Sequence, residues 1–249
     1  MIEKSLSSLT ELETEVELLR TLIQNNRKHE FQVLSKVLFR GQCDSSWKLQ
    51  TTLERYTDKE FSVGLYNTVL SSIYPATASF TGKEWPMQDE SWDKSKDHFS
   101  TPPNYEFMVY ARHHGFPTPL LDWSQSIYVA LFFAFQNVRE DKDIAIFAFI
   151  DYLGGGKGGW VGAPQISELG PYVTSHKRHF IQQGQYTVAV KHDKNNNWAY
   201  CSHDDALKES TDSEQDILYK FTLPGTLKNS ILAKLYEMNL SAFTLYGNE

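Results

Sequence analysis

Residues 110–135 read YARHHGFPTPLLDWSQSIYVALFFAF, and this stretch decides the fold more than any other part of the chain. Its first half contains paired histidines, a glycine, two prolines, an acid, a tryptophan and a serine in close succession. Its second half, residues 127–135, is a strongly apolar run that predicts a buried helix. Many polar residue types directly before a buried element are typical of a ligand pocket. We therefore expect a pocket at the start of this helix.

A second informative stretch lies upstream, where a short apolar strand at 37–39 leads into Arg40-Gly41-Gln42. A guanidinium at a strand end can reach a pocket, and its planar fork suits phosphate oxygens or ribose hydroxyls. The residue types alone leave an alternative open, in which Arg40 forms a structural ion pair at the edge of the sheet.

The histidines next to the central turn are candidates for pocket residues. Adjacent side chains point in different directions on any regular element, so His113 and His114 are not expected to share a metal ion. One structural histidine and one that faces the pocket is our interpretation. The other cysteines and histidines do not have zinc-site spacing, so no metal is expected.

Ser124 and the glutamine-rich stretch 182–186 each allow two interpretations. Ser124 either caps the helix that begins near Ser126 or belongs to a helix N-terminus that binds an anionic ligand. The sequence QQGQY at 182–186 runs into a strand, where its amides either bind a ribose or form a polar edge.

Periodicity predicts a mixture of helices and strands without βαβ regularity. We expect helices at 6–26, 52–80, 127–135 and 231–238, and strands at 37–39, 143–151, 186–190, 218–223 and 242–246. The first helix has its apolar residues at Leu12, Val16, Leu19 and Ile23, and the second has a buried side of Leu53, Phe61, Leu65, Val69, Leu70 and Ile73. The polar stretch 81–104 reads as a long loop, a lid or an insertion, and 191–213 reads as a polar excursion.

One further pattern is rejected as a site. Gly154-x-Gly156-x-x-Gly159 follows a strand and formally matches a dinucleotide fingerprint, but residues 160–164 do not start the helix that such a site needs.

The mixture of helices and strands predicts the α+β class, with an amphipathic helix in residues 1–30 packed on one domain formed by residues 31–249.

Composition limits the possible functions. The chain has 249 residues and a formal net charge of -7, which argues against binding nucleic acid by extensive backbone neutralisation. Only two cysteines are present, no signal peptide is visible, and no apolar run approaches the ~20 residues that cross a bilayer. We expect a soluble protein of a reducing cytoplasm, with no membrane partner.

Several blocks resemble the FRG domain, a bacterial family named for its Phe-Arg-Gly signature. They are FRGQ at 39–42, WKL at 47–49, HHGFPTPLLDWS at 113–124, ALFFA at 130–134 and QQGQYT at 182–187. The resemblance covers roughly residues 30–246.

The order of these blocks is similar to that of ADP-ribosyltransferases of the Arg–Ser–Glu type, which use NAD as co-substrate. That resemblance implies a split mixed β core flanked by helices. It implies catalytic roles for Arg40, His114, Ser124 and Gln183. It also implies NAD contacts from Arg40, Gly41, Gln42, Tyr110, His113, His114, Asp122, Trp123 and Ser124, with Tyr110 or Trp123 stacking on nicotinamide.

One position departs from the transferase pattern. Where the transferases carry a catalytic Glu, this chain offers Gln183 or Gln185, and an amide can neither supply charge nor accept a proton. The hypothesis is an NAD-dependent ADP-ribosyltransferase-like toxin or effector of a phage-defence or toxin–antitoxin system. It would modify RNA, DNA or protein and be neutralised by an antitoxin protein. The alternatives are a non-catalytic nucleotide-binding module and a protein-interaction module.

Overall fold

A mixed sheet of eight strands forms the centre of the computed structural model, which describes residues 1–87, 92, 101–158, 162–170, 173, 177–209 and 214–247. The strand order is β1-β8-β4-β2-β3-β6-β5, and β7 pairs with β6. The strands are β1 (Ile2–Ser5), β2 (Val37–Gln42), β3 (Leu121–Ser124), β4 (Asp143–Tyr152), β5 (Gln165–Leu169), β6 (Gly184–His192), β7 (Trp198–Tyr200) and β8 (Gln215–Pro224). β1 runs parallel to β8, and the other pairs are antiparallel.

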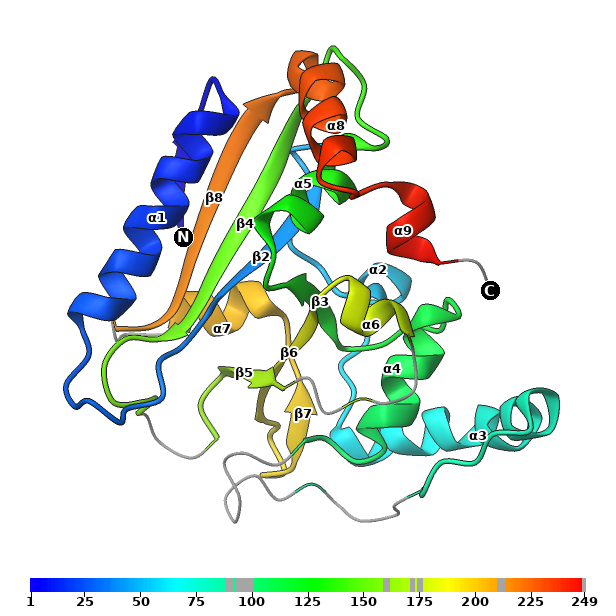
Figure 1. Cartoon of the computed structure of the whole chain (residues 1–249). Coiled ribbons are helices and arrows are strands. Elements are labelled where there is room, and N and C mark those ends of the chain that lie inside the picture. The colour runs from blue at the N-terminus through cyan, green and yellow to red at the C-terminus, as the bar shows by residue number, and fades with distance from the viewer. Residues whose placement is uncertain are drawn as a thin grey trace.

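Helices surround this sheet (Figure 1). They are α1 (Leu9–Asn25), α2 (Thr52–Tyr56), α3 (Val63–Thr81), α4 (Tyr105–His113), α5 (Ile127–Phe135), α6 (Lys177–Ile181), α7 (His203–Glu209), α8 (Lys228–Glu237) and α9 (Ala242–Tyr246), with a 3₁₀ turn at Gly225–Leu227. The α+β class, with helices flanking a mixed β core in a single domain, is confirmed.

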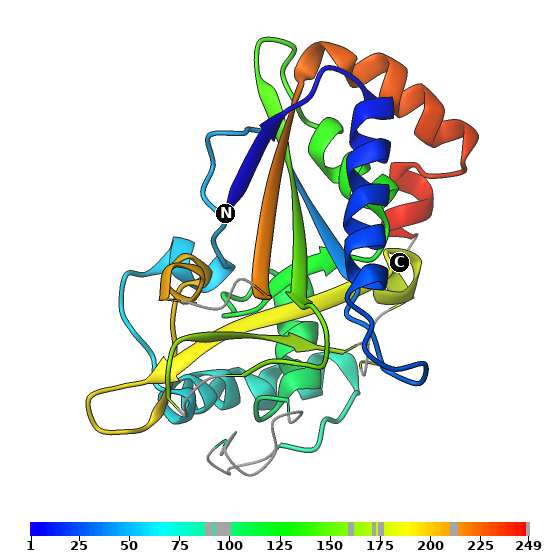
Figure 2. The same cartoon turned by 90° about the vertical axis from the view of Figure 1, so that its left-hand side faces the viewer.

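The sheet divides between β2 and β3. These strands share one residue pair, Phe39 with Ser124, whereas β2 pairs with β4 along its whole length. One half contains β1, β8, β4 and β2, and the other contains β3, β6, β5 and β7 (Figure 2), where β6 runs across the direction of β4 and β8. Beyond Phe39, residues 40–42 of β2 therefore have no partner strand on the side that faces β3.

Three apolar clusters fill the spaces between these layers. The first packs α1, α5 and α8 on one face of the β8-β4-β2 half. The second packs α3 and α4 on the β6 half, and the third lies between the halves and α7. Since each cluster buries a different face, the two halves of the sheet are fixed in place by separate sets of helices.

Several expected elements are confirmed. α1 begins after Ser8, whose side chain accepts from the Glu11 amide, and it buries the four apolar residues predicted for it. The long strand β4, the strands β6 and β8, and the helices α5 and α8 also lie where the sequence predicts them. The region from Gly162 onward forms a turn and then β5, in agreement with the rejection of the glycine fingerprint.

Other expectations are wrong. Residues 242–246 form α9 and not a strand, because Ser241 and Thr244 make a capping box. The polar excursion 191–213 contains two regular elements, β7 and α7. The stretch 52–80 is mainly helical as expected, in the two helices α2 and α3, but Leu65 and Val69 of its expected buried side are exposed because α3 turns Val63, Tyr66, Asn67 and Leu70 inward.

Two further predictions have other outcomes. Half of the residues in the loop expected at 81–104 lie outside the described residues. The strand expected at 37–39 continues to Gln42, so Arg40 lies within β2 and not after its end.

Candidate functional site

A cleft of about 800 Å³ opens where β2 and β3 separate. Its walls come from β2 and the segment that follows it to α2, from the end of α4, from β3 and α5, and from α6, the start of β6 and α9. The lining residues used below are Arg40, Gly41, Gln42, Trp47, Lys48, Thr52, Arg55, Arg112, His113, Asp122, Trp123, Ser124, Arg178, Gln182, Tyr186 and Tyr246.

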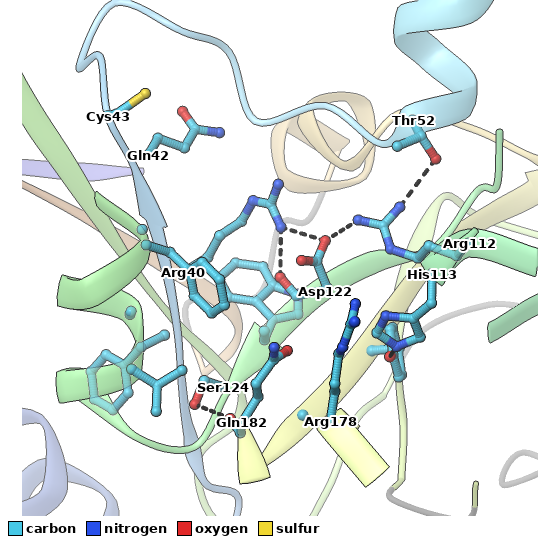
Figure 3. A pocket seen from close by; sticks show the side chains of 18 of the residues that line it. Arg40, Gln42, Cys43, Thr52, Arg112, His113, Asp122, Ser124, Arg178 and Gln182 are labelled. Atoms are coloured by element: carbon cyan, nitrogen blue, oxygen red, sulfur yellow. Dashed lines mark hydrogen bonds and ion pairs between the residues drawn. The ribbon is translucent and has the colours of Figure 1, made fainter. Parts of the chain in front are cut away.

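An ion-pair cluster around Asp122 lies at the centre of the cleft (Figure 3). Arg40 donates from Nη1 to the Asp122 carboxylate at 2.6 Å and to its backbone oxygen at 2.7 Å. Arg112 donates to the same carboxylate oxygen from the other side and bonds Thr52 Oγ1 at 3.1 Å. One carboxylate thus holds two guanidiniums in fixed positions, one from β2 and one from α4.

The two guanidiniums also keep Asp122 ionised. Desolvation by the walls of the cleft raises the pKa of this carboxyl, but Arg112 and Arg40 outweigh that effect and hold the pKa well below its ordinary value. Asp122 is therefore a negative charge that two neighbours share, and half of its side chain is still accessible from the cleft.

Positive charge dominates the rest of the lining. Lys48, Arg55 and Arg178 join the two arginines of the cluster, and Asp122 is the single acidic residue among the described residues that line the cleft. Burial, together with the nearby Arg40 and Arg112, lowers the pKa of Arg55, so the guanidiniums repel one another. Because the whole chain has a net charge of -7, this cleft is a local concentration of cations that favours an anionic ligand.

The strand end and the buried helix meet at a glycine. A Cβ on Gly41 would lie 1.9 Å from the backbone oxygen of Ala130 in α5, so no side chain fits there. The Phe-Arg-Gly order of β2 thus has a separate role for each residue: Phe39 fills the core, Arg40 reaches the cleft, and Gly41 allows α5 to pack on the strand.

Ser124 is not the cap of α5, because Ser126 is the residue whose side chain accepts from the Val129 amide. Ser124 instead donates from Oγ to the backbone oxygen of Gln182 at 2.7 Å and accepts from the Ser126 amide at 3.0 Å. Its hydroxyl therefore joins the start of α5 to the turn before β6. The anion-binding alternative, which uses the N–H groups at the start of the helix, stays a prediction.

The two histidines lie on different sides of the end of α4. His113 lines the cleft, where its Nε2 is 3.0 Å from the hydroxyl of Tyr186. His114 is not a lining residue, and its ring lies 4.3 Å from that of Tyr110. Tyr110 also packs on Trp85, so neither Tyr110 nor His114 reaches the space around Asp122.

Trp123 borders the cleft but belongs mainly to the core. It stacks on Phe149, and its Nε1 donates to Thr187 Oγ1 at 2.8 Å. Thr187 in turn bonds Nε2 of the buried His203, whose pKa burial lowers to about 3, so this imidazole is neutral. These contacts make Trp123 a wall of the site and leave no free ring face for nicotinamide stacking.

The glutamines expected near the missing acid do not face the cleft. Gln183 is exposed in a turn with a positive φ, and Gln185 is fully buried. The neighbouring Gln182 lines the cleft instead, and its amide donates to the Leu245 oxygen at 3.0 Å. Gln182 and Gln183 both lie in the turn between α6 and β6, before the strand begins at Gly184, so the conformation of this turn decides which of the two side chains reaches the cleft.

Sequence reasoning did not identify several lining residues, and the arginines are the most important of them. Arg112 lies inside the central stretch that decided the fold, and its charge beside two histidines was the available signal. Arg55 and Arg178 are on the short helices α2 and α6, which have no strong pattern.

Two other properties were searched in the described parts of the chain. There, no group of three or more histidine, cysteine or acidic side chains is arranged to hold a metal ion. No helix there combines the length and the apolar character that crossing a bilayer requires.

Comparison with known families gives one match, in which the model described as FRG domain covers residues 35–143. Comparison with curated proteins finds no match. Comparison with solved structures finds none either. The matched range contains β2, α4, β3 and α5, and therefore every residue of the Asp122 cluster.

Proposed function

Because residues 35–143 form an FRG domain that supplies the Asp122 cluster, we propose that this cluster binds NAD as a co-substrate. The protein would transfer ADP-ribose to a macromolecule, as a toxin or effector of a bacterial phage-defence or toxin–antitoxin system. The observation that carries the proposal is the excess of cations in the cleft of an acidic chain.

The residues around the cluster fit a pyrophosphate. Arginine forks bind phosphate oxygens in a two-point geometry. Arg40, Arg112 and Arg178 are the residues that would hold the diphosphate, because all three line the cleft.

The chemistry requires a leaving group and a base. When NAD is bound, the bond between ribose C1′ and the nicotinamide nitrogen breaks, and its electron pair leaves with nicotinamide. An oxygen or nitrogen of the acceptor forms the new bond to C1′ and gives up a proton. His113, which faces the cleft, is our candidate for that base, and Asp122 supplies negative charge close to the developing positive charge.

Gln183 has no role in this proposal, because its side chain does not line the cleft. His114 has none for the same reason. Ser124 acts as a positioning residue that holds the turn before β6 next to α5.

A second candidate is a module that binds a nucleotide without transferring it. It is supported by the state of Asp122, whose charge is already shared by two arginines and is less available to stabilise a transition state. Both candidates predict binding, and turnover separates them.

The test measures NAD binding and nicotinamide release with the purified full chain. NAD at about 100 times Kd should stabilise the fold by about 2.7 kcal/mol in a thermal-shift experiment. Arg40→Gln and Arg112→Gln should lose this stabilisation, whereas the exposed Arg139→Gln should keep it.

Function in cells is tested by induced expression in bacteria, followed by assays for ADP-ribose adducts in RNA, DNA and protein. Growth arrest with adducts, lost in the folded Arg40→Gln and Arg112→Gln variants, supports the transferase. Stabilisation by NAD without nicotinamide release leaves the binding module, and no stabilisation by NAD refutes the transferase. A toxin also requires a neutralising antitoxin, and co-expression with the product of a neighbouring gene tests that part.

A further inference from the structure

The rim of the cleft formed by residues 47–56 carries exposed aromatic rings next to cations. Trp47 is 54% exposed and Tyr56 is 77% exposed. Lys48 follows Trp47, Arg55 precedes Tyr56, and Trp47, Lys48 and Arg55 all line the cleft. Trp47 and Tyr56 are among several exposed rings of this chain, and what distinguishes them is their position next to cations at the cleft.

This rim is held in place by the fold. The Gln42 amide donates to the Lys48 oxygen at 3.3 Å, and Leu49 is buried in the cluster between the sheet halves. Thr51 and Glu54 form a capping box at the start of α2, and the Leu53 amide donates to the Thr118 oxygen. The backbone is therefore preformed, and the two rings project from it.

Each ring lies at or next to the lining of the cleft, because Trp47 is a lining residue and Tyr56 directly follows the lining residue Arg55. Thr52 and Arg55 line the cleft from α2, and Tyr56 lies one helical turn after Thr52, on the same face of the helix. Within the described ranges, neither Trp47 nor Tyr56 packs against another aromatic ring. Their faces are available to a flat partner.

Glu54 is the one acid in the sequence of the rim, and it belongs to the capping box at the start of α2. Lys48 forms no ion pair with the described residues, and Arg55 donates to the Gln50 backbone oxygen at 3.0 Å. Rings that offer stacking faces, alternating with cations, are the combination that binds unpaired bases and their phosphates. An acidic peptide would pair with the cations but would not provide bases that stack on the rings.

We propose that the rim at residues 47–56 binds a short stretch of single-stranded nucleic acid, which is the acceptor of ADP-ribose. This inference rests on the proposed function, because it names the substrate class of the same cleft, the acceptor of ADP-ribose. A base stacks on Trp47, Tyr56 extends the stack, and Lys48 and Arg55 contact phosphates. A nucleophilic oxygen or nitrogen of the strand then enters the cleft beside His113.

The acidic surface elsewhere limits the contact to a few phosphates. Single strands lose about 0.7 log units of affinity per log unit of salt for each neutralised phosphate, so two or three contacts give a slope of about -1.4 to -2.1. A steeper slope would require cations that the rim does not have.

The experiment measures fluorescence anisotropy of labelled RNA and DNA oligonucleotides, single-stranded and duplex, with the full chain. Single strands should bind at least tenfold more tightly than the duplex. Trp47→Ala should weaken binding by about fivefold to a hundredfold, the range expected for loss of one stacked base. Tyr56→Ala should weaken binding less, and Tyr236→Ala, an equally exposed tyrosine on α8, should bind like the unsubstituted chain.

Parallel thermal shifts with NAD keep the two proposals distinguishable. NAD should stabilise Tyr56→Ala, whose ring does not line the cleft, as it stabilises the unsubstituted chain, which also shows that this variant is folded. Equal binding of single strands by Trp47→Ala, Tyr56→Ala and the unsubstituted chain overturns the inference, and so does equal binding of duplex. Oligonucleotide binding that depends on Trp47 without any NAD binding supports the rim and refutes the proposed function. Nicotinamide release without oligonucleotide binding supports the proposed function and refutes the binding of nucleic acid at the rim.

Discussion

Replacing Gly41 with alanine tests the packing that places the cleft. The new Cβ would lie 1.9 Å from the Ala130 oxygen and 2.9 Å from the Ala134 nitrogen. To restore a contact of 3.4 Å with that oxygen, β2 and α5 must separate by about 1.5 Å. Both contacts are to backbone, so no side chain can rotate away. Overpacking of a core costs about 1–3 kcal/mol, and a clash with backbone lies at the upper end, so we expect a loss of about 3 kcal/mol.

Equilibrium unfolding in urea, followed by circular dichroism, measures this loss. Gly64→Ala is the matched control, because Gly64 is in helix α3 and a Cβ there would meet nothing within 4 Å. Alanine is favoured over glycine in a helix, so the control should be unchanged or more stable by about 0.5 kcal/mol. If the free energy of unfolding of Gly41→Ala lies within about 0.5 kcal/mol of that of the original chain, the close contact between β2 and α5 is not needed for stability, and the reasoning is refuted.

Three further predictions concern single groups. Ser124→Ala should lose about 1–3 kcal/mol in urea unfolding, because the Gln182 oxygen and the Ser126 amide each lose their bond to the hydroxyl. The unsubstituted chain should be more stable than Asp122→Asn, and the difference in unfolding free energy should be full above about pH 4. This difference should fall as the pH is lowered through the depressed pKa of Asp122, and urea midpoints across pH measure it. Burial and then Asp151 raise the pKa of Glu168 to about 7, which destabilises the fold as the pH rises from about 4 towards 8. Glu168→Gln should therefore gain stability over the original chain across that range, and an equal pH dependence of the two would contradict it.

The sequence allowed prediction of those elements that have a strong local pattern. α1 repeats its apolar residues at helical spacing, and β4 is a nearly continuous run of β-forming residues, so both were found with small errors in their bounds. The apolar run of α5 and the turn before it located the cleft.

The errors occurred where a distant contact decides the structure. α9 is five residues with no helical repeat, and its capping box at Ser241 competes with a β-like composition. β5 and β7 exist because they pair with β6, and isolated strands of that length carry little signal. Gln183 was one residue away from the lining glutamine, because the turn between α6 and β6 decides which of the two side chains reaches the cleft.

The partners of Arg40 could not be predicted for a related reason. The motif indicated a guanidinium beside a pocket, but not that Asp122 and Arg112 would meet it, since this depends on how α4 packs against β3. The open alternatives for Arg40 were in fact compatible: it makes an ion pair and also lines the cleft.

The two sides of the cleft come from segments that are made at different times. A ribosome synthesises the arginines of the Asp122 cluster with the first half of the chain, whereas Arg178 and Tyr246 follow much later. The Arg178 guanidinium donates to the Tyr246 backbone oxygen, which closes the far wall. A nascent chain that stops before Tyr246 therefore has the two arginines of the Asp122 cluster without this closing contact.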